Sequence, residues 1–397
     1  MLPVGLSMLW ESAAPVEALA DRFGFDGIDE AAAWCVETLS ASWGIQVREV
    51  GRVVISDHNA ILWAATDHGD VVVKWSRALD QFHRLDASTR LLGLLAERGF
   101  PVARPLLSAS GSARVVTDGP VGKLSLAVLP ELAGEWLNVG DEAAVRAAGA
   151  VLAELHAALA TIRPDAALAN EPVDWRSRIA GWLDDESGVG DGVGTSGTAS
   201  RGTASRGAGS RGAGSRGAGS GGVGSGGVGA GGVGAGGTAG RGVSSPCAGG
   251  HVAGGESPEG NAVSDSRDGV AHEAARRLAQ ALSAAPRLDD AVQLVHNDFR
   301  AANILTRGSR IVGVLDFDDV VVTHRVYDLA KASLYLGTLF TDWGPTAPDI
   351  RRAFREGYEA VRPLSDAERG WLEILTLWLG LRAAQSQPEP ARWLAAL

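Results

Sequence analysis

Three polar residues follow two short apolar stretches in the last third of the chain. In the segment LVHNDFRAANIL, Asp298 precedes Asn303 by five positions, and in the segment LDFDD, Asp316 ends the next apolar run. Mg²⁺ prefers oxygen ligands, and it usually takes one or two protein groups together with phosphate oxygens. Paired strands at 303–306 and 311–316 would bring Asn303 and Asp316 to one corner, with Asp298 on the adjacent loop. The spacing predicts a metal-nucleotide site in which Asp298 faces an acceptor hydroxyl.

Further spaced elements accompany these residues, and their order resembles that of a known family. The family is the aminoglycoside phosphotransferase and choline-kinase-like group of small-molecule kinases, which are distant relatives of protein kinases. Four elements in one order are far more specific than any one of them. The resemblance covers most of the chain outside a Gly-rich segment and the first 40 or so residues. The family's H-x-D-x-x-x-x-N loop resembles the segment with His296, Asp298 and Asn303, and its D-F/W-D/E element resembles Asp316, Phe317 and Asp318. Its later D-L-A resembles Asp328, Leu329 and Ala330, and its L-H at the end of a helix resembles Leu155 and His156.

The resemblance implies a role for each matching residue. Lys74, at the end of the segment VVVK, would hold the α- and β-phosphates of ATP. Asp298 would orient the acceptor hydroxyl and accept its proton, and Asn303 and Asp316 would hold Mg²⁺. Positioning and charge neutralisation carry most of the catalysis of phosphoryl transfer, so an ordinary Asp suffices as the base. ATP and Mg²⁺ are the cofactors that the resemblance implies.

Two departures from the family's pattern concern the nucleotide end of the site. The family often places a Glu on the helix after the lysine strand to pair with the lysine, but the aligned position here is near Ser88, and Asp86 is the nearest acid. The sequence also lacks the Gly-rich phosphate loop of protein kinases and has SDHN at 56–59 between the first two predicted strands. Ser56 and Asn59 are the candidates for covering the nucleotide phosphates, although a plain hairpin turn explains the same residues.

Other polar residues of the pattern have structural roles that compete with chemical ones. We expect His296 to brace the catalytic loop, since an Asp already serves as the base, and we expect Asp328 to brace the same loop. His156 is expected to be a packed helix residue. Asp318 and Asp319 would contact either the substrate or solvent.

The surrounding elements predict an α+β fold of the two-lobed protein-kinase-like type. In the first half, apolar and alternating runs predict an antiparallel sheet, and an apolar stripe from Leu85 to Leu95 predicts one helix across it. In the second half, helical spacing dominates, for example from Val145 to Leu159 and from Ile350 to Val361. The strands predicted in the first half are 47–55, 60–66, 71–75, 114–117 and 123–129.

We divide the chain into an N-terminal helical extension at 1–44, a nucleotide-binding N-lobe at 45–130, and a helical C-lobe at 131–397 with the catalytic and acceptor-binding residues. The C-lobe is interrupted at 187–266, where Gly, Ser and Arg dominate and the five-residue motifs SRGAG and SGGVG repeat. Collagen needs Gly at every third position, and this segment lacks the large apolar side chains that would offset the entropy of ordering. We therefore expect a disordered insert.

Composition limits the location and the partners. A formal net charge of −11 argues against generic nucleic-acid binding, because phosphate contacts supply most non-specific affinity. Two cysteines provide no disulfide framework, and the sequence shows neither a signal-peptide pattern nor about 18 uninterrupted apolar residues. We expect a cytoplasmic protein without a membrane or nucleic-acid partner, while the oligomeric state stays open.

The expected function is ATP-dependent transfer of the γ-phosphate to a hydroxyl of a small molecule, with an amino sugar or aminoglycoside as the expected acceptor. The acidic segment 131–191 favours an acceptor with an amino group. The alternative among enzymes is a homoserine- or choline-type kinase of the same fold. The alternative from another class is a non-catalytic nucleotide-binding module that the Arg-Gly repeats tether to a partner. The presence of Lys74, Asp298, Asn303 and Asp316 favours an enzyme over that module.

Overall fold

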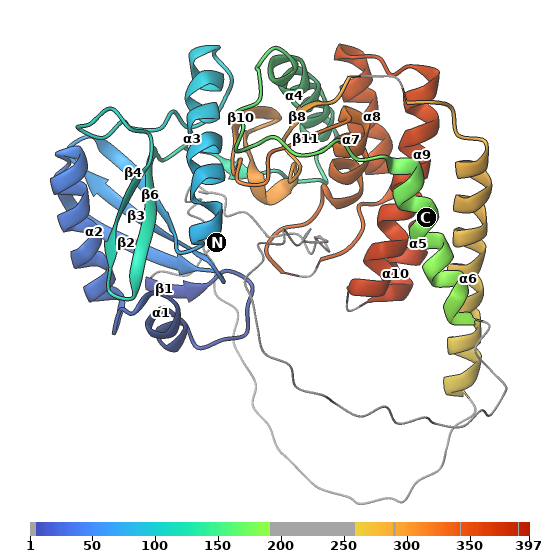
Figure 1. Cartoon of the computed structure of the whole chain (residues 1–397), viewed down its shortest axis with the longest axis horizontal. Helices are drawn as coiled ribbons and strands as arrows, with labels where there is room; N and C mark the ends of the chain where they lie inside the picture. Colours follow the sequence, from blue (N-terminus) through green and yellow to red (C-terminus); the bar gives the residue numbers. More distant parts are fainter. Residues whose placement is uncertain (1–4, 191–258, 289–290, 342, 388) are drawn as a thin grey trace, which may run out of the picture. The chain divides into compact units, whose positions relative to one another are not determined.

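The structure is a computed structural model that describes residues 5–190, 259–288, 291–341, 343–387 and 389–397. The chain divides into two units, one made of Met1–Pro172 with Gly226–Leu397 and the other of Val173–Ser225. The larger unit contains an N-terminal sheet and a mostly helical second part, which can be followed by colour in Figure 1. The smaller unit contributes one described helix, α5 (Trp175–Gly190).

The N-terminal sheet has six strands in the order β1-β2-β3-β4-β6-β5, with every neighbouring pair antiparallel except β1 and β2. Residues 5–8 lie in the segment predicted as a helical extension, but they form a strand that pairs with β2. The strands are β1 (Gly5–Met8), β2 (Val47–Ile55), β3 (Asn59–Thr66), β4 (Gly69–Ser76), β5 (Val115–Gly119) and β6 (Gly122–Pro130). The helices of this part are α1 (Pro15–Phe23), α2 (Ile28–Trp43), the 3₁₀ turn η1 (Leu79–Gln81) and α3 (Phe82–Glu97).

The two faces of the sheet have different neighbours, because successive side chains of a strand point to opposite faces. On one face, Val73 and Trp75 of β4 belong to a core that includes side chains of α1 and α2. On the other face, Val72 packs in a separate cluster with Ile61 of β3. Lys74 lies between Val73 and Trp75 in the sequence, so it shares the face of Val72. The alternation therefore directs the lysine away from the α1 and α2 core.

The helical part depends on a close contact between α4 and α8. A Cβ atom added to Gly149 of α4 would overlap the carbonyl oxygen of Phe354, and one added to Gly357 of α8 would overlap that of Arg146. Glycine permits this approach because it has no Cβ. The helices are α4 (Glu142–Ala160), α6 (Glu259–Ser283), α7 (Arg325–Tyr335), α8 (Pro348–Val361), α9 (Asp366–Ser386) and α10 (Pro390–Leu394).

Two small sheets connect the helical part to the predicted catalytic residues. One has the strand order β10-β9-β7 and the other β11-β8, and all pairs in both are antiparallel. The hairpin of β9 and β10 corresponds to the strand pair predicted at 303–306 and 311–316, and it connects Asn303 to Asp316 along the chain. The strands are β7 (Glu135–Trp136), β8 (Gln293–Val295), β9 (Ile304–Arg307), β10 (Arg310–Val314) and β11 (Val321–Thr323), and the 3₁₀ turn η2 (Ala301–Asn303) precedes β9.

Two features bear on the predicted insert and location. Helices α5 and α6 extend into the two ends of the predicted insert, and residues 191–258 lie outside the described residues.

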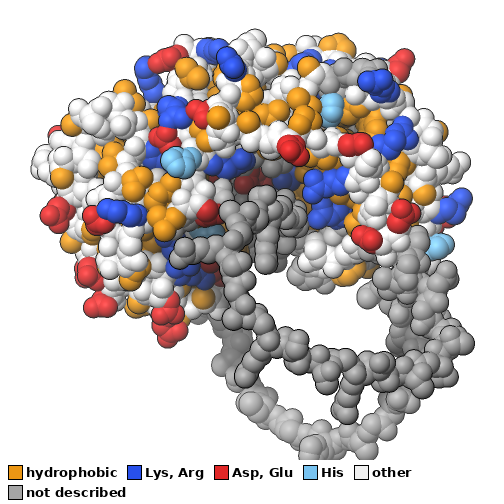
Figure 2. Space-filling view, in the orientation of Figure 1, with side chains coloured by type: hydrophobic (Ala, Val, Ile, Leu, Met, Phe, Trp, Pro, Cys, Tyr) orange, Lys and Arg blue, Asp and Glu red, His pale blue; other side chains and the backbone are white. Residues whose placement is uncertain are grey.

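Among the described helices, α4 alone has the length and mean hydropathy of a membrane span. Half of its apolar 18-residue stretch is buried inside the protein, where α4 packs on α8 and β8. On the described part of the face in Figure 2, acidic and basic side chains are interspersed, and both signs occur around a central hollow.

Candidate active site

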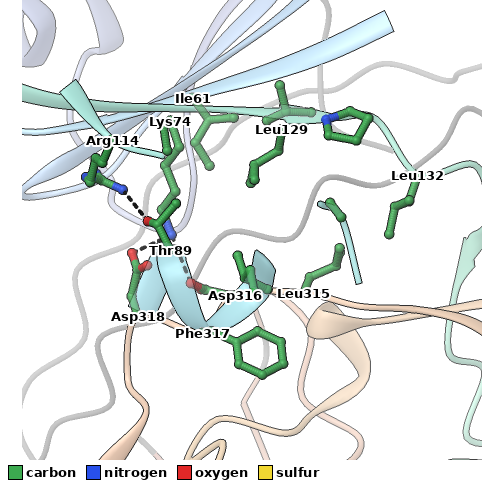
Figure 3. Close-up of a pocket in the computed structure, with 15 residues that line it drawn as sticks. Ile61, Lys74, Thr89, Arg114, Leu129, Leu132, Leu315, Asp316, Phe317 and Asp318 are labelled. Carbon is green, nitrogen blue, oxygen red and sulfur yellow. Dashed lines mark hydrogen bonds and ion pairs between the residues drawn. The ribbon is translucent and has the colours of Figure 1, made fainter. Parts of the chain in front are cut away.

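Lys74 lies in a pocket beside two carboxylates of the segment that follows β10 (Figure 3). Its Nζ atom is 2.8 Å from Oδ1 of Asp316 and 2.5 Å from Oδ2 of Asp318. Burial alone would lower the pKa of Lys74, but the two carboxylates outweigh burial and raise its pKa above the ordinary value. The ammonium group is therefore charged at neutral pH, and it faces the pocket as the alternation along β4 requires.

Asp298 is held from two directions within the loop between β8 and β9. Nε of Arg300 donates to both of its carboxylate oxygens, at 3.1 and 3.2 Å. Nδ2 of Asn303 donates to Oδ2 of Asp298 at 2.7 Å and to its backbone oxygen at 2.9 Å. The side chain is only 10% exposed in spite of its charge, and these charge-assisted bonds hold the carboxylate in place.

The predicted metal ligands each present an oxygen with no partner. Oδ1 of Asn303 and Oδ2 of Asp316 are buried, and neither has a hydrogen-bond partner among the described residues. An unpaired buried oxygen is costly, and such groups in proteins commonly meet a ligand, an ion or water. Asp316 also has a positive φ of 59°, which few residues other than glycine adopt and which is frequent at functional sites. These two oxygens fit the ligand preference of Mg²⁺.

Two buried side chains, those of Asp328 and His296, brace the loop of Asp298. Asp328 of α7 accepts hydrogen bonds from the backbone N–H groups of His296 and Asn297, at 3.1 and 2.9 Å. His296 accepts a bond from the backbone N–H of Asp298 through Nδ1 and donates to the carbonyl of Leu315 through Nε2. The same imidazole therefore links the catalytic loop to the residue before Asp316, which agrees with the bracing role expected for His296 and Asp328.

His156 continues this brace into α4 and α8. Its Nε2 lies 3.0 Å from Oδ2 of Asp328, and its Nδ1 lies 2.8 Å from the hydroxyl of Tyr358. Burial lowers the pKa of His156, although Asp328 opposes this effect. A neutral imidazole that donates to Asp328 and accepts from Tyr358 satisfies both bonds.

Three of the predicted nucleotide-site residues do not meet Lys74. Asp86 forms an ion pair with Arg90 one turn further along α3. Ser56 closes the turn between β2 and β3, since its backbone N–H and its hydroxyl both donate to the carbonyl of Asn59. Neither Ser56 nor Asn59 lines the pocket around Lys74, which matches the hairpin-turn interpretation of these residues more closely than a phosphate cover.

Four cationic residues near the site were not singled out from the sequence. Arg300 pairs with Asp298, and Arg114, only 6% exposed, lies beside Thr89 and Lys74 in the pocket (Figure 3). Lys331 donates to the backbone and side-chain oxygens of Asn297, at 2.6 and 3.2 Å. Arg300 carries the one signal available beforehand, because it stands two positions after the predicted base. The fourth residue is Arg84 of α3, which donates to the carbonyls of Asp318 and Val320.

The two remaining acids of the LDFDD segment have different surroundings. Asp318 is tied to Lys74, whereas Asp319 lies on the side of the catalytic loop. The backbone oxygen of Asp319 accepts a bond from Nδ2 of Asn297 at 3.1 Å, and its charge acts on Lys331. Both acids therefore interact with groups of the chain in this structure.

The Lys74 pocket has a volume of about 50 Å³, room for a few water molecules at most. Aliphatic side chains from β3, β4 and β6 face the polar groups of the LDFDD segment across it. These side chains are Ile61, Val72, Ala127 and Leu129.

Comparisons with solved structures show a shared fold. An amicoumacin kinase in complex with AMP-PNP, Ca²⁺ and Ami is 14% identical, with a TM-score of 0.50 over 93% of this chain and 95% of that one. An AMP-bound spectinomycin phosphotransferase is 12% identical, with a TM-score of 0.52 over 91% and 93% of the two chains. A microcompartment-associated aminopropanol kinase is 15% identical, with a TM-score of 0.52 over 92% and 94%. The kinase-like fold predicted from the sequence is thus confirmed.

Comparisons of sequence give shorter matches to curated proteins and a long match to a family. The homoserine kinase of Neisseria meningitidis serogroup B is 34% identical over 83 residues, and that of Gluconobacter oxydans is 32% identical over 88 residues. These matches span only about a quarter of the length of each relative, 25% and 27%. The sequence profile of the phosphotransferase enzyme family matches residues 55–189 and 258–367, which is more than half of the chain. The first matched part contains the lysine strand, and the second contains the catalytic loop and the LDFDD segment. The chain therefore belongs to the phosphotransferase enzyme family.

Proposed function

We propose that this protein is an ATP-dependent, Mg²⁺-requiring O-phosphotransferase that moves the γ-phosphate of ATP to a hydroxyl of a small molecule. The observation that carries this proposal is that Asn303 and Asp316 each have a buried oxygen without a hydrogen-bond partner in the described part of the chain. Asn303 connects this corner directly to Asp298. A divalent ion and a nucleotide would satisfy both oxygens and the charge of Lys74 together.

The residues of the chain divide the chemistry among themselves. Lys74 offers a fixed positive charge to the nucleotide phosphates, and Mg²⁺ held by Asn303 and Asp316 would neutralise charge on those phosphates. Asp298 orients the acceptor hydroxyl and accepts its proton as the new bond from oxygen to phosphorus forms. The bond between the γ-phosphorus and the bridging oxygen breaks, and ADP leaves. Because positioning dominates such reactions, the bonds that hold Asp298 in place contribute directly to the rate.

The acceptor is a small molecule with a hydroxyl group, and two classes compete. The acidic segment 131–191 favours an amino sugar or aminoglycoside, and Asp318 and Asp319, if they contact the substrate, could add carboxylates for an ammonium group. Asp318 is instead paired with Lys74, which weakens that argument. The partial identity with homoserine kinases supports homoserine as the second candidate. Choline has no comparable support, although it belongs in the same screen.

A screen of ATP turnover tests the proposal. ADP release would be measured with Mg²⁺ and each of several acceptors, namely amino sugars, aminoglycosides, homoserine and choline. We expect acceptor-dependent ADP release with one class and loss of the signal on chelation by EDTA. Binding of Mg²⁺ and AMP-PNP without turnover on any acceptor would favour the non-catalytic module instead. The Arg-Gly repeats that such a module would use lie outside the described residues.

The cellular setting follows from the same proposal. ATP and small hydroxylated metabolites or drugs are available in the cytoplasm, so we place the protein there. Neither a membrane nor nucleic acid is needed for the reaction, and the interspersed charges in Figure 2 are consistent with a small-molecule substrate.

A further inference from the structure

The α3 helix does not offer the lysine a carboxylate. The residues of α3 at this level are Ser88 and Thr89, and both hydroxyls donate to the carbonyl of Leu85 in their own helix. Only Thr89 of the two lines the pocket of Lys74. The pairing of the lysine strand with this helix, expected for the family, is therefore replaced by another arrangement in this chain.

The carboxylates beside Lys74 both come from the segment after β10, and they differ in what else they do. One oxygen of Asp316 accepts a hydrogen bond from Lys74 at 2.8 Å, and its other oxygen is buried without a hydrogen bond to any described residue. This second oxygen is the one assigned above to Mg²⁺. Asp318 has no such assignment. Its Oδ2 is also buried without a hydrogen bond among the described residues, but it forms an ion pair with Nζ of Lys74 at 2.5 Å. Asp318 is thus the carboxylate beside Lys74 that has no proposed role as a metal ligand.

Arg114 lines the same pocket as Lys74 and Asp318, and its charge acts on Asp318 (Figure 3). Its guanidinium is anchored by Ser125, at 2.7 Å to the hydroxyl and 3.1 Å to the carbonyl, and by the hydroxyl of Thr89 at 3.3 Å. Burial lowers the pKa of Arg114 to about 10, with the charge of Asp318 opposing this, so the group is cationic at neutral pH. Asp318 therefore interacts electrostatically with two buried cations, Lys74 and Arg114.

A second arginine fixes the backbone that carries Asp318. Arg84 of α3 donates to the carbonyl oxygens of Asp318 and Val320. The helix thus contacts the LDFDD segment through an arginine on backbone oxygens, and not through a carboxylate on the lysine. Both the side chain and the main chain of Asp318 are consequently held in place.

We propose that Asp318, held between Lys74 and Arg114, is the positioning residue that orients the Lys74 ammonium group toward the nucleotide phosphates, in place of a carboxylate from α3. Asp318 itself does not touch the reacting atoms in this proposal. Removal of its charge would leave Lys74 with Asp316 as its remaining carboxylate among the described residues, and it would remove the charge that opposes the effect of burial on Arg114. Removing one partner of a buried charge pair is costly, because the other charge then stays buried without compensation.

This inference rests on the proposed function, and nucleotide affinity tests it separately from transfer. The Kd of AMP-PNP with Mg²⁺ would be measured by calorimetry on the full chain and on Asp318→Asn, which keeps the shape and removes the charge. We expect Asp318→Asn to weaken binding by about tenfold or more. If the unchanged chain binds no AMP-PNP, the proposed function fails. If it binds and Asp318→Asn binds equally well, only the role of Asp318 fails.

Moving the carboxylate to α3 provides the sharper test. Thr89→Glu adds two heavy atoms next to a cavity of about 50 Å³, and it would place an acid beside both Lys74 and Arg114. In the Asp318→Asn background, Thr89→Glu should restore most of the AMP-PNP affinity, whereas the uncharged Thr89→Gln of similar shape should not. Equal behaviour of the Glu and Gln variants, both folded by their melting temperatures, would overturn the proposal.

Steady-state kinetics decides the question even where the double variants do not fold. With the acceptor found by the screen, Asp318→Asn should raise KM for ATP and leave KM for the acceptor unchanged. A rise confined to the acceptor would show that Asp318 contacts the substrate, and it would exclude the positioning role.

Discussion

The side-chain amide of Asn303 links the predicted base to the predicted metal corner. Its nitrogen donates twice to Asp298, and its oxygen is buried without a hydrogen-bond partner among the described residues. Arg300 holds the other side of Asp298 and is itself fixed by the carbonyl of Leu339, at 2.6 Å. At the scale of single residues, hydrogen bonds thus fix Asp298, while oxygens of Asn303 and Asp316 stay without such a bond among the described residues.

Removing one of these oxygen ligands should affect binding before chemistry. We expect Asp316→Ala to weaken the binding of Mg²⁺ with AMP-PNP, because the metal corner loses a charged ligand. Calorimetric titration measures this affinity directly. Asp118→Ala is the control, because Asp118 is an exposed strand residue outside the site. Unchanged affinity in Asp316→Ala would place the metal elsewhere.

At the scale of elements, the crossing of α4 and α8 positions the brace of the catalytic loop. His156 of α4 and Tyr358 of α8 meet in a hydrogen bond, and Asp328 of α7 joins both to the loop. The approach of the two helices depends on Gly149 and Gly357. The position of the catalytic loop thus depends on the contact between α4 and α8, although neither helix carries a proposed catalytic residue.

Gly149→Ala should destabilise the protein although alanine is the better helix former. The gain in helix propensity is about 1 kcal/mol, but the new Cβ would overlap the backbone of α8, which gives way less easily than a side chain. We expect the free energy of unfolding to fall by about 1–3 kcal/mol, the usual cost of overpacking. Gly93→Ala in α3 is the matched control, because nothing lies within 4 Å of its added Cβ, and it should be stabilising. Equal effects of the two substitutions in urea denaturation would refute this account of the crossing.

Burial of His156 predicts a pH dependence of stability. Its pKa is lowered in the folded protein from the ordinary 6.5, since burial disfavours the imidazolium and Asp328 only partly compensates, with Arg362 and Arg325 adding to the decrease. Between the lowered pKa and 6.5 the unfolded chain binds more protons, so stability rises with pH in this window and is lost as pH falls below about 6.5. His156→Gln should reduce proton uptake on unfolding there by up to about one proton. Urea denaturation at several pH values from 5 to 7.5 measures this, and an unchanged pH dependence would contradict it.

Elements that depend on local periodicity were predicted well from the sequence, and contacts between distant segments were not. The strand at 47–55 has its predicted bounds, and the helical spacing from Val145 to Leu159 falls within α4. The strand at 5–8 was missed because four residues carry little pattern and gain their structure by pairing with β2. The spaced motif indicated Asp298, Asn303 and Asp316, but the partner of Lys74 is set by three-dimensional packing that no local spacing encodes.

At the scale of the whole molecule, the family match continues on both sides of residues 191–258, which are outside the described part of the chain. Our domain division, with N-lobe, C-lobe and insert, stays a prediction. Helices α5 and α6 lead to and from this segment. The residues of the candidate site all lie in the larger unit, outside Val173–Ser225.

We expect the segment to be dispensable for folding and turnover. Replacing residues 191–258 with a short Gly-Ser linker should keep or slightly raise Tm and leave kcat/KM unchanged, because the entropy of loop closure changes by only about 0.6 kcal/mol per doubling of length. Thermal melts and acceptor-dependent ADP release check both points. A loss of turnover that is restored by the native sequence but not by a Gly-Ser chain of equal length would assign a role to its five arginines.

The most direct test of the central claim is a paired measurement on Asp298→Asn. The variant keeps the size of the side chain but cannot accept the acceptor's proton, while Asn303, Asp316 and Lys74 are untouched. We predict that kcat for acceptor-dependent ADP release falls by about 10²–10⁴-fold, with the Kd of Mg²⁺-bound AMP-PNP close to that of the unchanged protein. Turnover near the original rate in the variant would contradict the assignment of Asp298 as the base and, with it, the proposed mechanism.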